Sequence, residues 1–409
     1  MTNVNVFIPP GATFAEACPV VKKSLIARRL EKIQSSGVRR MFSIVQQIPD
    51  AISLGIGEPD FSPPLHVIDA AKEALDRGKT HYTPSAGIQR LRDAIAKKAR
   101  REYGLEYDSN EEVLVTIGAT QAVFLSLMTI INPGDEVLLF DPGFVCYAPD
   151  VVIAGGTPVG TPLRERDGYK IDLDTVMSHI TDKTRAIIIN SPNNPTGAVF
   201  SYEDLHKLTK FLVERDIIVI SDEVYEKIVY DDAKHFCLAS FPGMKDRTIV
   251  VNSFSKTYAM TGFRVGYALG PKELIRQMLK IHQYTVACVD SAAQYAAVAA
   301  LEGPQELVKT MVTEFDRRRR LMYKRVNEIE GFSCVLPKGA FYVFANVKEL
   351  NMQSVNVADF LAKEARVITV AGSAFGTNGE GYLRLSYATS YEKIEEAMDR
   401  IEKAVKKLR

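Results

Sequence analysis

The sequence lacks several features that would assign it to a particular class of protein. Its 409 residues carry 51 basic and 50 acidic side chains, a formal net charge of +1. This balance gives no electrostatic footprint for nucleic acid or an anionic membrane. No apolar run approaches membrane-spanning length, and the N-terminal stretch lacks the positive start and long apolar core of a signal peptide. We therefore expect a cytoplasmic protein with no nucleic-acid or membrane partner.

Cysteine and histidine are also sparse, and neither is grouped. No CxxC occurs, and the six histidines stand singly. The cysteines are Cys18, Cys146, Cys237, Cys288 and Cys334. This spacing indicates neither a disulfide framework nor a structural zinc site, so we expect no metal.

What the sequence does contain is an alternation of strand-like and helix-like segments from Glu112 onward. Strand patterns cover Val113–Ile117, Glu136–Phe140, Ala186–Asn190, Ile217–Asp222, Thr248–Asn252 and Arg264–Leu269. Helical patterns lie between several of them, at Gln121–Ile131, Tyr202–Glu214 and Glu273–His282. This alternation predicts an α/β fold with a mostly parallel sheet between helices.

The chain is long enough for two domains, and its pattern changes near residue 300. We predict a large domain over residues 62–300, a smaller α+β domain over residues 24–61 and 301–409, and an N-terminal arm over residues 1–23. The segments predicted for the smaller domain are helices at Ser24–Gln34, Val38–Ile48, Glu306–Glu328, Val357–Glu364 and Tyr391–Lys407, and strands at Ser333–Leu336, Phe341–Ala345, Ala365–Val370 and Tyr382–Ser386.

One lysine follows the strand-like run that begins at Thr248. Lys256 stands in a hydroxyl-rich turn with Ser253 and Ser255, and Arg264 comes shortly after. An open α/β sheet places its ligands at such strand ends. An amine beside an anion site suits a phosphate-bearing aldehyde held as a Schiff base. The alternative is a surface lysine in a loop.

Two further loops follow predicted strands. Small residues in Gly118–Gln121 expose backbone N–H groups at a helix start, where the helix dipole favours an anion. A plain turn capped by Thr120 is the alternative there. In Asn190–Gly197, two prolines and a glycine form a rigid turn that could orient the amide of Asn194, unless it is merely a loop of turn-forming residues.

Two charged residues stand among apolar neighbours. Asp222 ends the apolar run Ile217–Ile220, where a carboxylate is costly unless it pairs with a cation such as a protonated pyridine. Its alternative role is a cap on the next helix. Arg384 lies within Tyr382–Ser386 and suits a bidentate carboxylate contact, with an internal salt bridge as the alternative.

Together these stretches resemble the fold-type I pyridoxal-phosphate enzymes, and specifically the class I aminotransferases of the aspartate and aromatic group. The resemblance runs from about Ser24 to the C-terminus. The motifs that carry it, in family order and spacing, are SLGIGEPDF, HYTPSAGIQRLR, INSPNNPTGAV, VISDEVY, SFSKTYAMTGFRVGY, PKGAFY and GYLRLSYA.

The resemblance implies that the large domain binds pyridoxal 5'-phosphate. Lys256 would carry the cofactor as a Schiff base, and Asp222 would pair with its pyridinium nitrogen. Asn194 and Tyr225 would bond the phenolic oxygen of the ring, on which Phe144 would stack.

The family pattern also implies how the phosphate is held. Backbone N–H groups of Ala119 and Thr120, the hydroxyl of Ser253 and the guanidinium of Arg264 would bind it. Tyr82 would reach it from the partner subunit of a homodimer.

The substrate's α-carboxylate would bind Arg384, the Asn194 amide and the Gly57 backbone. The freed amine of Lys256 would then act as the general base, with Tyr225 and Asp222 as the other catalytic residues. The implied reaction is transamination between an L-amino acid and 2-oxoglutarate, with aspartate or an aromatic amino acid as donor.

Other activities remain open on the same scaffold. A C–S lyase that performs β-elimination and another class I or II aminotransferase, such as an alanine-type enzyme, are the alternatives. A regulator that keeps the scaffold is disfavoured because no basic helix-turn-helix segment precedes residue 60. A redox dehydrogenase is disfavoured because no GxGxxG follows an early strand.

The donor's side chain is the least determined feature. Some bacterial members of the group use a lysine at the position of Thr120 for a second carboxylate, and that lysine is absent here. Arg39 and Arg40 are possible substitutes, or else charges on a helix surface. We therefore expect broad specificity, with aspartate and aromatic amino acids both usable.

Overall fold

The structure is a computed structural model that describes residues 25–33 and 48–408. The chain separates into two units, residues 1–34 and 35–409, which are described separately. The predicted arm, Arg39, Arg40 and all but the last residue of the predicted helix Val38–Ile48 lie outside the described residues. Within the described ranges, no helix is long and apolar enough to cross a membrane.

The described part of the first unit holds one short helix, α2 (Arg28–Glu31). The sequence predicted a longer helix over Ser24–Gln34, and within residues 25–33 that prediction is wrong. Leu25, Ile26 and Leu30, the large apolar residues of this stretch before Ile33, are exposed. An amphipathic helix this short has little intrinsic stability without burial of that side.

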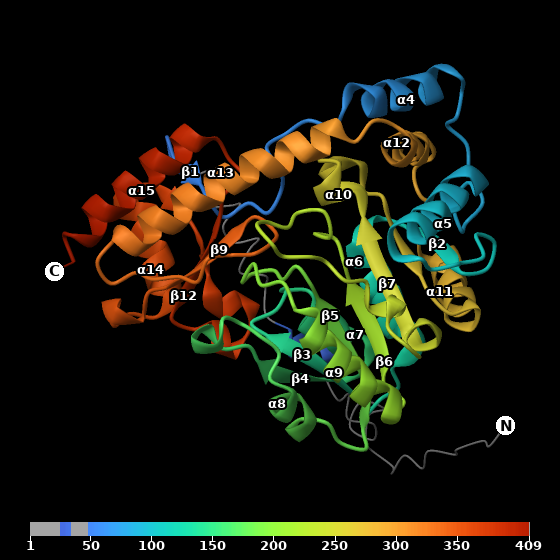
Figure 1. Ribbon diagram of the computed structural model, residues 1–409, viewed down its shortest axis with the longest axis horizontal. Coiled ribbons are helices and arrows are strands. Elements are labelled where there is room, and N and C mark those ends of the chain that lie inside the picture. Colours follow the sequence, from blue (N-terminus) through green and yellow to red (C-terminus); the bar gives the residue numbers. More distant parts are fainter. Residues whose placement is uncertain (1–24, 34–47, 409) are drawn as a thin grey trace, which may run out of the picture. The chain divides into compact units, whose positions relative to one another are not determined.

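A seven-stranded sheet forms the centre of the second unit (Figure 1). Its strands are β2 (Val113–Thr116), β3 (Glu136–Asp141), β4 (Thr157–Pro162), β5 (Thr184–Asn190), β6 (Ile218–Asp222), β7 (Thr248–Ser253) and β8 (Gly266–Leu269). They lie in the order β2-β8-β7-β6-β5-β3-β4, and only the pairings of β8 are antiparallel. The predicted mostly parallel sheet is confirmed.

Helices cover both faces of this sheet. They are α4 (Leu65–Asp76), α5 (Gln89–Tyr103), α6 (Gly118–Ile130), α7 (Tyr147–Ala154), α8 (Leu173–Ser178), α9 (Tyr202–Glu214), α10 (Phe254–Thr257), α11 (Lys272–Thr285) and α12 (Ser291–Glu302). Ile220 and Val251 pack with α6 and α11, whereas Val219 packs with α9, and Val250 with α5 and α12. Strands that are apolar on both sides therefore bury both faces.

The C-terminal part forms a second, smaller set of elements. They are the strands β1 (Ile52–Ser53), β9 (Tyr342–Asn346), β10 (Val367–Ile368), β11 (Val370–Ala371) and β12 (Tyr382–Ser386), and the helices α13 (Glu306–Glu328), α14 (Ser354–Phe360) and α15 (Tyr391–Val405). The antiparallel sheet has the order β11-β12-β9, and β1 pairs in parallel with β10. Residues 52–53 thus join the C-terminal part, which supports the predicted division into a large and a small domain. That division stays a prediction.

Two strand predictions in this part are wrong. Ser333–Leu336 forms no strand, and Ser333 makes only an isolated bridge to Asn346. Ala365–Val370 is not one strand either, because Leu361–Ala365 continues α14 as a π-helical turn and Arg366 then has a φ of +53°. Extended pairing begins only after this left-handed residue.

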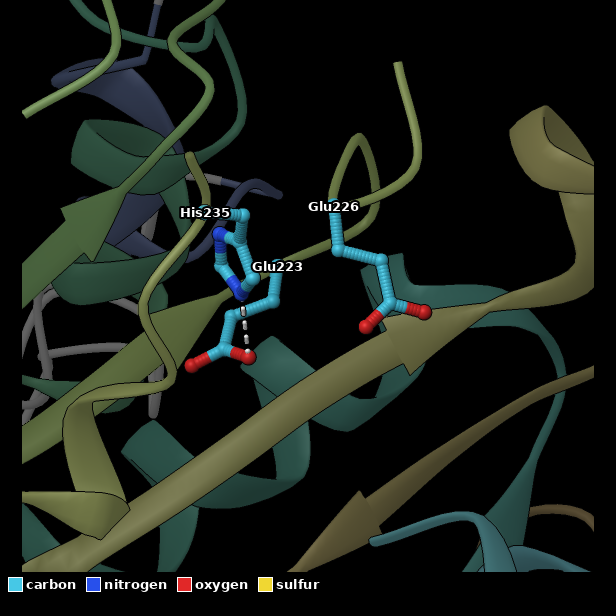
Figure 2. A group of neighbouring side chains, drawn as sticks. All are labelled: Glu223, Glu226 and His235. Carbon is cyan, nitrogen blue, oxygen red and sulfur yellow. Dashed lines mark hydrogen bonds and ion pairs between the residues drawn. The ribbon is translucent and has the colours of Figure 1, made fainter. Parts of the chain in front are cut away.

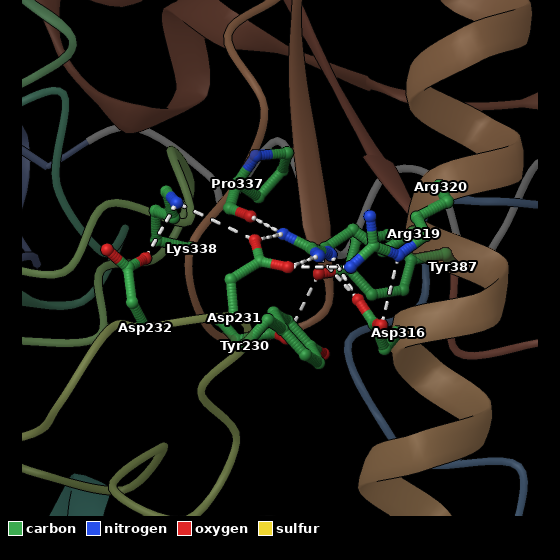
Figure 3. A network of polar contacts seen from close by, with 10 residues as sticks. Tyr230, Asp231, Asp232, Asp316, Arg319, Arg320, Pro337, Lys338 and Tyr387 are labelled. Carbon is green, nitrogen blue, oxygen red and sulfur yellow. Dashed lines mark hydrogen bonds and ion pairs between the residues drawn. The ribbon is translucent and has the colours of Figure 1, made fainter.

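Arg319, within α13, is fully buried and joins separate segments of the chain (Figure 3). Its guanidinium donates to both oxygens of Asp231 at 3.0 Å and to the carbonyl of Pro337 at 2.7 Å. Asp316, one turn earlier on the helix, accepts from its Nε at 2.8 Å. The ring of Tyr230 lies 4.6 Å from the guanidinium carbon. Burial alone would lower the pKa of Arg319, but hydrogen bonds to the two aspartates outweigh burial and raise it.

We expect Arg319→Ala to lower the free energy of unfolding by about 3–5 kcal/mol, because it removes a fully buried cation from its two aspartates and leaves the buried carbonyl of Pro337 without its donor. Arg320 is the matched control. It contacts Asp231 and Asp316 too, but its side chain is 57% exposed, so Arg320→Ala should cost under about 1 kcal/mol. Urea unfolding of both variants measures the difference. Equal losses would show that the Arg319 network does not anchor α13.

Candidate active site

A cavity of about 330 Å³ lies at the carboxyl ends of the central strands. Asn190, Asp222 and Ser253 are the last residues of β5, β6 and β7, and all three line it. Neighbouring parallel strands end at the same edge of a sheet, so these side chains are brought together. The predicted site residues in the lining are Gly57, Ala119, Thr120, Phe144, Asn194, Asp222, Tyr225, Ser253, Lys256, Arg264 and Arg384.

Asp222 presents a buried carboxylate to the cavity. The hydroxyl of Tyr147, the first residue of α7, donates to its Oδ2 at 2.6 Å. The backbone N–H of Val224 donates to Oδ1 at 3.3 Å, so Asp222 caps a turn rather than a helix. Burial raises the pKa of Asp222 to about 6, against the opposing effect of the Tyr147 hydrogen bond. The carboxylate is therefore ionised above that pH.

Lys256 lies on α10, directly after β7, and its Nζ donates to the carbonyl of Gly57 at 2.6 Å. Its side chain reaches into the cavity, so it is no loop-surface lysine. Burial, followed by the nearby charges of Arg384 and Arg264, lowers the pKa of Lys256 to about 8. A sizeable fraction of this amine is neutral at physiological pH, as a nucleophile or base requires.

An anion site lies where α6 begins. The preceding residue, Ile117, provides no side-chain cap, and the first N–H groups of a helix lack intrahelical partners. Ala119 and Thr120 are in this first turn and line the cavity. Thr120 is therefore not the N-cap that the alternative interpretation required. A Cβ at Gly118 would lie 2.5 Å from an Nη of Arg264, so glycine admits that guanidinium to the helix start.

Arg384 is a buried guanidinium without an ion pair among the described residues. It donates to the Oδ1 of Asn194 at 3.1 Å and to the carbonyl of Gly55 at 2.7 Å. The rings of Tyr342 and Phe375 lie 4.3 and 4.9 Å from its Cζ. Its Nε has no partner among the described residues. The alternative interpretation, an internal salt bridge, is therefore wrong, and the arrangement suits an incoming carboxylate.

The remaining predicted residues differ in where they lie. Asn194 is buried, and because its Oδ1 accepts from Arg384, its NH₂ group is left to donate. Tyr225 is buried, whereas Phe144 is partly exposed and meets Tyr147 edge-on. Tyr82 does not line this cavity, and its side chain is 89% exposed.

A second polar group lies beside the end of β6. Glu223, Glu226 and His235 bring one ligand atom each to within 4.8 Å of one another (Figure 2), the only such group among the described residues. His235 contacts Glu223 at 2.9 Å, and the buried ammonium of Lys98 contacts Glu226 at 2.7 Å. Burial would lower the pKa of Lys98, but Glu226 and other anionic neighbours raise it. Because Lys98 already pairs with Glu226, this group is better described as polar contacts that support the strand end.

The sequence interpretation missed two tyrosines whose hydroxyls contact predicted site residues. Tyr147 donates to Asp222, and the hydroxyl of Tyr342 lies 2.8 Å from that of Tyr225. Tyr342 ends the quoted PKGAFY stretch, and Tyr147 follows the predicted site residue Phe144 by three positions. An aromatic residue at either position is expected to be buried whether or not it contacts the site. The contacts with Asp222 and Tyr225 could therefore be found only from the folded structure.

Comparison with known proteins gives consistent matches. The model of the family described as aminotransferase class I and II matches residues 49–401. The chain is 48% identical to an aspartate aminotransferase of Pyrococcus abyssi, over 92% of this chain and 97% of that relative. It is 46% identical to aromatic-amino-acid aminotransferase 2 of Thermococcus litoralis, over 93% and 98%. A solved aromatic aminotransferase from Pyrococcus horikoshii aligns with a TM-score of 0.86 and 49% identity, covering 90% of this chain and 100% of that one.

We expect Lys256 to react with aldehydes at unusually low pH, because only the neutral amine attacks a carbonyl. Reductive methylation with formaldehyde, followed by peptide mass spectrometry, should give a half-maximal rate near pH 8, against 10.5 for an ordinary lysine. Arg384→Gln removes one positive neighbour and should move this midpoint upward. Lys98, whose pKa is raised, is the internal control and should stay unlabelled at pH 8. A Lys256 midpoint above about pH 10 would contradict the assignment.

Proposed function

The chain belongs to the class I and II aminotransferases, and on that premise we propose that it transfers the amino group of an L-amino acid to 2-oxoglutarate using pyridoxal 5'-phosphate. The carrying observation is that Lys256, Asp222 and Arg384 line one cavity. They supply, in turn, an amine of lowered pKa, a buried carboxylate and a guanidinium that has no carboxylate partner among the described residues. The proposal rests on the amine, the carboxylate and the guanidinium together, because none of the three would support it alone.

The donor set of the cavity fits the cofactor. At one end, the first N–H groups of α6, the Ser253 hydroxyl and Arg264 suit a phosphate dianion. Gly266 lets β8 pack directly against this helix start, because a Cβ there would lie 2.6 Å from the nitrogen of Ala119. At the other end, Asp222 suits a protonated pyridine nitrogen, while Lys256 would hold the aldehyde carbon as a Schiff base.

Phe144, Asn194 and Tyr225 complete the proposed cofactor site. Phe144 offers an aromatic face, while the Asn194 NH₂ and the Tyr225 hydroxyl are donors for the phenolic oxygen of the ring. When bound, the cofactor supplies an electron sink for the pair that remains on the substrate's Cα.

The chain's own residues would bind and orient the substrate and move its proton. Arg384 binds the α-carboxylate, which fixes the substrate's Cα relative to Lys256. Once the substrate's amino group has displaced Lys256 from the aldehyde carbon, the freed Lys256 amine would remove the Cα proton and return it, which the lowered pKa of this amine, about 8, favours near neutral pH. Asp222 remains ionised above about pH 6 and so keeps a cationic partner protonated.

The described lining limits how a second carboxylate could be recognised. Its cations are Lys256, Arg264 and Arg384, and all three have proposed roles. Within the described residues, none is left for the distal carboxylate of aspartate. Arg39 and Arg40, the other candidates, lie outside the described residues. The described lining by itself supports broad donor use, because it presents an apolar ring with no mandatory ionic contact.

We expect aspartate, tyrosine and phenylalanine all to donate to 2-oxoglutarate, with kcat/KM values within roughly a hundredfold of one another, because one unmatched contact is worth a few kcal/mol at most. Initial rates for these donors and alanine, with product analysis, provide the test. Lys256→Ala is the negative control, since it removes the attachment point and the base. Strict aspartate use would contradict broad specificity, and pyruvate with ammonia would indicate a β-eliminating lyase instead.

We also propose a homodimer in which Tyr82 completes the phosphate site of the partner. The 89% exposure of its side chain supports this, since a residue that served its own cavity would be covered. Tyr82→Phe should weaken cofactor binding several-fold without unfolding the chain, because one hydrogen bond to a charged group is lost. Exposed Tyr202 offers a matched Tyr→Phe control on α9. Sedimentation of a fully active monomer would refute the shared site.

A further inference from the structure

The PKGAFY stretch ends in a side chain that the proposed reaction does not yet use. Tyr342 is the first residue of β9, is 1% exposed and lines the cavity. A buried aromatic residue in a strand is usually core, and its ring does pack among other rings. Its hydroxyl, however, forms a hydrogen bond with that of Tyr225, another residue of the cavity, and a purely core role would not require this bond.

Three groups of the proposed site contact this one side chain. Its hydroxyl lies 2.8 Å from the hydroxyl of Tyr225. Its ring lies 4.3 Å from the Cζ of Arg384, a distance typical of a cation–π contact. A Cβ at Gly57 would lie 2.5 Å from the Tyr342 hydroxyl, so the Gly57 backbone, which accepts from Lys256, packs directly against it.

Sheet register explains why one residue can reach two ends of the site. In the antiparallel pair of β9 and β12, Tyr342 lies opposite Ser386, and Arg384 lies opposite Phe344. Tyr342 and Arg384 are therefore diagonal neighbours on the same face, within reach of an aromatic side chain. Tyr225 comes from the turn after β6, so Tyr342 connects the small antiparallel sheet to the central one.

The direction of the hydroxyl contact follows from counting protons. A tyrosine hydroxyl has one proton to donate. If Tyr225 donates it to the phenolic oxygen of the cofactor, the Tyr225 oxygen must accept from Tyr342. Tyr342 is then the donor in the pair, and hydrogen bonds in such a chain strengthen one another.

We propose that Tyr342 is a positioning residue with two separable parts: its ring supports Arg384 at the carboxylate end of the site, and its hydroxyl orients Tyr225 at the cofactor end. This inference rests on the proposed function, because it assigns Tyr225 and Arg384 the roles argued above. It concerns a residue that acts through these two and forms no bond with the reacting atoms.

Tyr342→Phe removes only the hydroxyl and so tests the cofactor end. In the protein loaded with pyridoxal phosphate, the pH midpoint of the visible absorption band should rise by about half a unit or more, since a weakened Tyr225 donor stabilises the ionised phenolic oxygen less. The dissociation constant of 3-phenylpropionate, an unreactive carboxylate, should stay within twofold of wild type. Kinetically, kcat should fall more than KM changes.

Tyr342→Leu removes the ring as well and so tests the carboxylate end. It should raise the dissociation constant of 3-phenylpropionate roughly tenfold or more, in line with the loss of a desolvated cation–π contact. Tyr169→Phe is the matched control for both variants. Tyr169 is 2% exposed, and its hydroxyl has no partner within the described residues, so its removal should shift neither quantity.

The outcomes separate the two levels of inference. If the wild type neither retains pyridoxal phosphate nor transaminates any donor, the proposed function fails and this inference fails with it. Suppose that the wild type retains pyridoxal phosphate and transaminates, but the absorption band has the same pH midpoint in Tyr342→Phe as in Tyr169→Phe. The orienting role of the hydroxyl is then wrong. If the folded Leu variant binds 3-phenylpropionate as tightly as wild type, the supporting role of the ring is wrong. Should the Leu variant not fold, the Phe variant alone decides whether Tyr342 positions Tyr225.

Discussion

The burial of a positive charge at Arg384 is the constraint on which the arrangement of the site depends. A buried ion is costly unless polar groups replace its water. Here the replacements are neutral: the Asn194 amide, the Gly55 carbonyl, and the rings of Tyr342 and Phe375. These groups come from widely separated parts of the sequence, so the buried charge of Arg384 is stabilised only when those parts have folded together. Because none of them is an anion, the charge is left available for a ligand.

The opposite wall of the cavity follows from a property of parallel sheets. Neighbouring parallel strands end on the same side, so three consecutive strands deliver Asn190, Asp222 and Ser253 to one edge. Asn190 adds a direct link, since its Nδ2 donates to the carbonyl of Asp222 at 3.0 Å. The central sheet thus fixes the spacing of the amide, carboxylate and hydroxyl groups, while the smaller sheet contributes the guanidinium. The cavity lies where these two sources meet.

Much of this could be predicted because the relevant signals are local. Apolar runs that end in polar residues located the strands, and the unusual neighbours of Lys256 and Asp222 pointed to a site. The elements that were missed have weak local signals. The strand β4 contains two prolines and a glycine, and α12 is an alanine-rich helix buried on nearly every side, so neither has a clear amphipathic pattern.

The unpredicted contacts at the site are of a different kind. The hydrogen bond from Tyr147 to Asp222 joins residues 75 positions apart, and the pairing of Tyr342 with Tyr225 spans 117. A single sequence gives the aromatic type at each position but not its partner. The hydrogen bond between His235 and Glu223 and the ion pair of Lys98 with Glu226 were missed for the same reason. Tertiary contacts of this sort become visible only when the sheet order is known.

The close approach of Gly57 to Tyr342 also limits how this site can change over evolutionary time. With tyrosine at position 342, a methyl group at position 57 would lie 2.5 Å from the hydroxyl oxygen, but the nearest ring carbons would be 3.5 and 3.7 Å away. Alanine at position 57 is therefore blocked by one oxygen atom rather than by the ring. Alanine at position 57 therefore requires the Tyr342 hydroxyl to shift or to be absent, so the residue at position 342 decides what position 57 can hold.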